Sequence, residues 1–178
     1  MDELTLLKYY NEFIIKQDYF ECHEIMEDAW KSKAHFSKED DEIFFIQLST
    51  AEYHYRRNNL YGARKIYRRA VARLDERHFP HLEYGLESGI IPLVRERLDT
   101  IGTEPFTPLL LPLTRPMLEA LRAYAMPQLS MEGFQGHIGT IHKKDITLVQ
   151  KHRLRDRSEI INVRNEKLRE KRPKGPRA

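Results

Sequence analysis

The residues of this chain that could do chemistry lie in one short stretch, from Tyr19 to Trp30, which reads YFECHEIMEDAW. On an α-helix successive residues turn by about 100°, so His23 and Glu27 lie roughly 40° apart, with Trp30 on the same side. An imidazole and a carboxylate then fall in the middle of a stripe that is otherwise apolar. Because burying an unpaired charge is costly, these two groups must have partners elsewhere in the fold.

Partners for these two groups are predicted in the next amphipathic segment, residues 37–57. Gln47 and His54 lie two helical turns apart at the centre of its apolar arc. Because a short connection makes consecutive helices antiparallel neighbours, Gln47 and His54 are expected to meet His23 and Glu27 across the interface. The opposite face of this segment is predicted to be exposed to water, with Ser49, Glu52 and Arg56.

Several kinds of site fit this set of side chains. Two histidines and a carboxylate, His23, Glu27 and His54, are a candidate ligand set for zinc, manganese or iron. The motif is His-Glu-x-x-Glu rather than the zincin His-Glu-x-x-His, because Glu27 takes the place of the second histidine. Without a metal, the same groups form either a small-molecule site or a buried hydrogen-bond network that only fixes helix packing. Glu24 is then a supporting group or a surface acid.

Three further residues complete the candidate binding residues. Trp30 shares the stripe of His23, and Asn59 and Arg64 open the next helical segment. The full set is His23, Glu27, Trp30, Gln47, His54, Asn59 and Arg64. The sequence has no Gly-rich phosphate loop and no nucleotide or flavin motif, so a divalent metal is the one cofactor that these residues suggest. Neither a reaction nor a catalytic residue follows from them, and whether the protein is an enzyme stays open.

Composition restricts the class of protein. The chain has 178 residues and one cysteine, Cys22, so it cannot hold an internal disulfide framework. No apolar run approaches the roughly 20 residues that a membrane-spanning helix needs, and the start Met-Asp-Glu has no signal-peptide pattern. These features predict a cytoplasmic protein without a membrane partner.

The charge of the chain is unevenly distributed. Residues 151–178 carry 11 Lys/Arg and 4 Asp/Glu, a balance of +7, whereas the whole chain is +3, so the first 150 residues balance at −4. Nucleic acid is therefore a candidate partner only for the basic tail, through phosphate contacts. The other candidate partner is a second copy of the chain in a homo-oligomer.

Helical periodicity dominates the first 125 residues and predicts an all-α fold. The first three helices have predicted N-caps at Asp2, Asp18 and Ser37. The predicted helices span residues 3–16, 18–33, 37–57, 60–77, 91–101 and 116–125. The first four form a compact bundle of two stacked antiparallel hairpins, because a shift of 41 residues places Asp18 on Asn59 and Ala29 on Ala70.

The segments outside these helices are predicted to be irregular. Three prolines make residues 105–112 an extended strap over the bundle, and the glycines at 133, 136 and 139 predict a loop. Residues 145–150 fit a short strand or a helix start, and residues 153–171 a partly helical basic tail. The chain is accordingly divided into a helical bundle domain, residues 1–125, and an extension, residues 126–178.

The motifs of the bundle resemble those of a known family. The helix YFECHEIMEDAW, the spaced Gln47, Ala51 and His54, and the turn RNNLYGAR from Arg57 to Arg64 are similar to the family named domain of unknown function 309. That family has a Gly-Asn-x-x-Gly-Ala turn, and Asn58 replaces its first glycine, a mild departure because asparagine also tolerates the left-handed conformation. The resemblance covers roughly residues 13–101.

The resemblance implies an all-helical bundle and no activity, because none is established for the family. Two functional hypotheses therefore stay open. One is a small-molecule or metal-binding site on the polar residues between the second and third helices. The other is a tetratricopeptide-like adaptor for protein–protein interaction, suggested by Gly62-Ala63, Tyr67 and Ala70, with the polar cluster purely structural.

Overall fold

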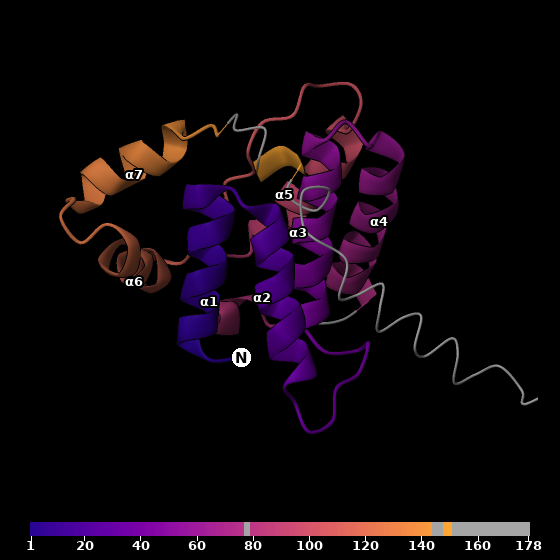
Figure 1. The fold of residues 1–178 in the computed structure, drawn as a ribbon, viewed down its shortest axis with the longest axis horizontal. Coiled ribbons are helices and arrows are strands. Elements are labelled where there is room, and N and C mark those ends of the chain that lie inside the picture. The colour runs from indigo at the N-terminus through magenta and orange to yellow at the C-terminus, as the bar shows by residue number, and fades with distance from the viewer. Residues whose placement is uncertain (77–78, 144–147, 151–178) are drawn as a thin grey trace, which may run out of the picture.

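A computed structural model of the chain describes residues 1–76, 79–143 and 148–150, and it confirms the predicted all-α fold. Four helices form the bundle: α1 (Glu3–Tyr10), α2 (Tyr19–Lys31), α3 (Glu42–Arg56) and α4 (Leu60–Glu76). They run alternately up and down, each beside the next, as two stacked hairpins (Figure 1). None of the helices in the described part of the chain is long and apolar enough to cross a membrane.

The starts of the first two helices follow from the sequence. Asp2 accepts a hydrogen bond from the backbone N–H of Thr5 (2.8 Å), and Asp18 accepts one from that of Glu21 (3.0 Å). Both bonds satisfy backbone donors that the first turn of a helix leaves unpaired. The two predicted N-caps are therefore confirmed.

The first predicted helix changes geometry halfway. Residues 3–16 divide into α1 and a π-helical segment, η1 (Asn11–Lys16), and η1 ends at Gln17 in the left-handed conformation with φ 54°. The Gln17 side chain donates to the carbonyl of Ile141 (2.8 Å) and accepts from the N–H of Lys143 (2.7 Å). The turn between η1 and α2 is therefore tied to a segment more than 120 residues away.

The third helix begins later than predicted. Ser37 caps a turn in the loop, where its hydroxyl accepts from the N–H of Glu39 (3.1 Å), and α3 starts only at Glu42. The loop is held by α2, because Trp30 Nε1 donates to the carbonyl of Ser37 (2.8 Å) and the Trp30 ring meets that of Phe36 edge-on. These contacts fix residues 32–41 in a non-helical path that periodicity alone does not reveal.

Three further α-helices follow the bundle in the described part of the chain. The predicted helices at 91–101 and 116–125 are confirmed as α5 (Ile90–Thr100) and α6 (Arg115–Ala125), with an irregular strap between them that buries Leu109 and Leu111. The predicted glycine loop is wrong, because α7 spans Met131–Thr140. Ser130 caps α7 through the N–H of Gly133 (3.1 Å), and Phe134 and Ile138, one turn apart, are buried in the core. This cap and this burial outweigh the helix-weakening effect of glycine, about 1 kcal/mol each.

The face of α3 that was predicted to be exposed is buried. Ser49 and Glu52 have no exposed surface, because α3 lies between α2 and α4 and is covered on both sides (Figure 1). Glu52 accepts from Nε (3.0 Å) and Nη2 (3.1 Å) of Arg97 and from the hydroxyl of Tyr67. Arg56 is partly buried, with its guanidinium 4.7 Å from the centre of the Tyr19 ring. The expectation that this face meets water is therefore wrong for Ser49 and Glu52, whereas Arg56 is partly exposed.

Two sequence predictions fall on other parts of the chain. The short element predicted at 145–150 lies partly outside the described residues, and the basic tail at 153–171 lies wholly outside them.

Candidate functional site

A pocket of about 180 Å³ opens between α2 and α3. It lies along a partly exposed line of α3, which carries Thr50, His54 and the following Arg57. The candidate site predicted from the sequence therefore lies on a side of α3 that is partly exposed to water. The pocket is lined by Tyr19, Phe20, His23, Thr50, Tyr53, His54 and Arg57.

The orientation of His54 is fixed by the start of α4. Asn59 caps α4, because its Oδ1 accepts from the N–H of Gly62 (3.1 Å). This bond directs the amide nitrogen of Asn59 to Nδ1 of His54 (2.9 Å), so Nδ1 must be the acceptor and the ring proton must sit on Nε2. Burial, together with the nearby Arg57, lowers the pKa of His54, which keeps the ring neutral at pH 7. His54 therefore offers the pocket an N–H donor rather than a lone pair.

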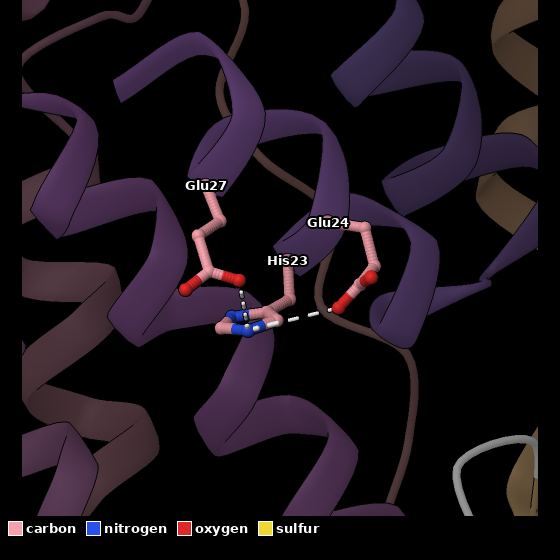
Figure 2. Close-up of side chains that lie close together, drawn as sticks. All are labelled: His23, Glu24 and Glu27. Atoms are coloured by element: carbon pink, nitrogen blue, oxygen red, sulfur yellow. Dashed lines mark ion pairs between the residues drawn. The ribbon is translucent and has the colours of Figure 1, made fainter. Parts of the chain in front are cut away.

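The tautomer of His23 follows in the same way from α3. The hydroxyl of Thr50 donates to the carbonyl of Ile46 (2.7 Å), so toward Nδ1 of His23 (3.2 Å) it can only accept. Nδ1 then carries a proton, and Nε2 is left facing two carboxylates. Figure 2 shows this arrangement: Nε2 lies 3.6 Å from Oε2 of Glu27 and 4.0 Å from Oε1 of Glu24.

The structure brings together some of the predicted residues. His23 and His54 line one pocket, and Glu27 lies beside His23 and also pairs with Lys31 (2.8 Å). Gln47 does not line the pocket, and its Oε1 is buried without a hydrogen-bond partner in the described part of the chain. The predicted metal set of His23, Glu27 and His54 stays a prediction.

The other predicted residues stabilise the helices and the loop around the pocket. Trp30 fixes the loop before α3, and Asn59 caps α4. Arg64 donates to the carbonyl of Ile101 (2.6 Å), which ties α4 to the end of α5. None of these three lines the pocket.

Most of the pocket wall was not predicted from the sequence. Thr50 lies between Gln47 and His54 at helical spacing, and this signal was available. Tyr53 and Arg57 are four residues apart, and the guanidinium lies 5.1 Å from the centre of the Tyr53 ring. Aromatic–arginine pairs four residues apart are common on solvated helix faces. The sequence therefore gives no reason to assign this pair to a site, and only its position in the pocket does so.

Replacing Gly62 by alanine is expected to leave stability nearly unchanged but to alter His54. A Cβ atom at position 62 would lie 2.6 Å from Nδ2 of Asn59, so the amide must swing away from His54. Losing the cap costs about 1 kcal/mol, and alanine gains about as much in helix propensity. Without the Asn59 donor, Nδ1 of His54 becomes able to take a proton, so the pKa of His54 should rise, while burial and Arg57 still lower it. NMR titration of its ring protons measures the change.

The matched control is Gly136→Ala on α7, where an added Cβ would meet no atom within 4 Å. It should stabilise the protein by about 0.5–1 kcal/mol and leave the His54 titration unchanged. A Gly62→Ala protein in which His54 titrates as in the parent would contradict the role given to Asn59.

Comparisons with known proteins agree on a family. The sequence profile of the family described as domain of unknown function (DUF309) matches residues 6–66. A relative, the "Uncharacterized protein YpuF" of Bacillus subtilis (strain 168), is 31% identical over 167 residues, which cover 91% of this chain and 92% of the relative. No solved structure matches the chain.

Proposed function

This chain belongs to the family named domain of unknown function 309, and because that name assigns no activity, we propose its function from the pocket between α2 and α3. We propose that the protein binds a small carboxylate whose apolar part is about one ring in size. The observation that carries this proposal is an aromatic pocket in which His54 is held as a neutral N–H donor beside the cation of Arg57.

The volume of the pocket limits the ligand. A cavity of about 150 Å³ holds benzene, so the 180 Å³ found here suits a molecule with a single ring. Pockets for drug-sized ligands and cofactors are about 300–1,000 Å³. The pocket therefore suits one ring rather than a whole nucleotide or flavin, for which the sequence has no motif either.

The lining of the pocket limits the chemistry of the ligand. Tyr19, Phe20 and Tyr53 supply aromatic walls, which suit a ring or a short branched chain. Nε2–H of His54 and the guanidinium of Arg57 are both donors. An arginine fork with a second donor beside it favours a carboxylate over a neutral or cationic group.

Binding of benzoate tests this proposal. We expect benzoate to shift the NMR signals of Tyr53, His54 and Arg57 in a saturable titration, whereas benzylamine, of similar size but opposite charge, should leave them in place. His54→Phe keeps a ring but removes the N–H donor. It should weaken benzoate binding about tenfold or more, because a hydrogen bond to a charged group contributes about 1.5–3 kcal/mol.

His137→Phe is the matched control, since His137 is exposed on α7 and does not line the pocket. It should bind benzoate as the parent protein does. Equal shifts with benzoate and benzylamine would contradict the assigned charge, and no shift with either would contradict the pocket as a ligand site.

A further inference from the structure

We propose that His23, Glu24 and Glu27 bind a divalent transition-metal ion on the exposed side of α2. The site goes beyond the carboxylate pocket, and its argument does not require a ligand there. One nitrogen of His23 and one oxygen from each glutamate all lie within 4.8 Å of one another. The three side chains converge from a single helix, at positions i, i+1 and i+4 (Figure 2).

The separations are close to those of a metal site. Ligand atoms about 2.1 Å from a zinc ion lie roughly 3.0–3.5 Å apart, by the tetrahedral and octahedral angles. Nε2 of His23 and Oε2 of Glu27 are already 3.6 Å apart, and Oε1 of Glu24 is 4.0 Å from the same nitrogen. A side-chain movement on the order of 1 Å, within the reach of a glutamate rotamer, would complete the three contacts.

The second and independent observation comes from α3. Thr50 gives its one hydroxyl proton to Ile46 and so holds the His23 proton on Nδ1. The lone pair of Nε2 then faces the two carboxylates, so all three groups can offer lone pairs to one ion. An outer hydrogen bond that fixes the tautomer in this way is what metal-binding histidines usually have.

Charge and exposure also fit a metal ion. Lys31 pairs with Oε1 of Glu27 (2.8 Å), which leaves Oε2 directed at His23. The side chains of His23, Glu24 and Glu27 are 29%, 30% and 32% exposed, so an ion can reach them from solvent.

The ligand set favours some ions and differs by one residue from the set predicted from the sequence. One imidazole and two carboxylates suit Mn²⁺, Fe²⁺, Co²⁺ or Zn²⁺, and three protein ligands leave coordination positions open. Glu24 takes the place that the sequence analysis gave to His54, whose Nδ1 accepts from Asn59 and whose Nε2 carries the proton.

Cobalt titration of the chelator-treated full chain tests the site. We expect one equivalent of Co²⁺ to bind, followed by its visible absorption and by calorimetry, with Zn²⁺ competing for the same site. The double variant Glu24→Gln/Glu27→Gln should lose this binding. Thr50→Val, which keeps the shape of the side chain but removes the acceptor for His23, should weaken it about 10–100-fold.

The control is Asp28→Asn, an exposed acid of the same helix outside the cluster, which should bind cobalt as the parent protein does. Unchanged binding in the double variant would overturn the proposal by placing the ion elsewhere. Lack of binding at millimolar Co²⁺ would overturn it too. Benzoate titration of the metal-free protein tests the pocket separately, so either proposal can fail alone.

Discussion

Arg97→Met is expected to lower the free energy of unfolding by about 3–5 kcal/mol, the usual effect of removing one partner of a buried ion pair. Arg97 is 7% exposed and Glu52 is fully buried. Methionine keeps the apolar stem of Arg97 but leaves the carboxylate without its cation. The strap also loses a contact, because Arg97 donates to the carbonyl of Thr107. Urea unfolding at pH 7 measures the loss.

The pH dependence of this loss identifies its cause. Burial raises the pKa of Glu52 and Arg97 opposes that rise, so without Arg97 the pKa of Glu52 in the folded state should rise further. A raised folded pKa makes the folded state bind more protons than the unfolded state. The deficit of Arg97→Met should therefore shrink as the pH falls from 8 to 5 and the carboxyl becomes neutral.

Two further variants serve as controls for Arg97→Met. Adding Glu52→Gln should recover much of the loss, because glutamine is neutral and its carbonyl still accepts from Tyr67. Arg95→Met removes an exposed pair with Asp75, whose side chains are 54% and 40% exposed, and should cost less than about 1 kcal/mol. Equal losses for Arg95→Met and Arg97→Met would contradict the structural role of the buried pair.

Phe45→Ala is expected to destabilise the protein by a similar amount, about 3–5 kcal/mol, through a cavity at the centre of the core. Phe45 has no exposed surface. Its ring packs edge-on against those of Tyr9 (5.2 Å), Phe44 (5.3 Å) and Tyr84 (5.4 Å), measured between ring centres. These contacts join α1, α3 and the short helix η2 (His81–Tyr84). Thermal and urea unfolding measure the effect.

Phe36→Ala is the matched control, because Phe36 is 54% exposed in the loop before α3. It should cost about 1 kcal/mol or less, the contribution of its edge-on ring contact with Trp30. Phe45 does not line the pocket, so the folded Phe45→Ala protein should still bind benzoate as the parent does. A loss below about 1.5 kcal/mol for Phe45→Ala would mean that the core closes around the gap.

The two sides of α3 have different roles. The apolar core and the Glu52–Arg97 pair fix α3 on its buried sides. The partly exposed line of α3 carries Thr50 and His54 and is left to the pocket. Stability and the proposed binding therefore depend mainly on different sides of one helix. Substitutions on one side are expected to change stability or binding without changing the other.

The sequence by itself determined most helices and the helix that carries the site. Helical periodicity, the caps Asp2 and Asp18, and the prolines of the strap are local signals, and the structure agrees with each of them. The stretch from Tyr19 to Trp30 was identified because a histidine and a glutamate interrupt an apolar stripe. Local rules suffice here because each backbone bond or cap joins residues only three or four positions apart.

Only the tertiary structure decided which side of α3 is buried. The apolar and aromatic side chains of α3 are distributed all around its axis, so its periodicity does not define one buried face. Which sides are buried depends on the positions of α2 and α4, which cover α3 on both sides (Figure 1). In the sequence Glu52 looks like a surface acid. Only the structure shows that it pairs with Arg97, which lies on α5, 45 positions away. The glycines of α7 predict a loop from the sequence, but the segment is helical because Phe134 and Ile138 are buried in the core. Thr50, on another helix, contacts Nδ1 of His23, and such contacts between distant residues leave no mark in local spacing.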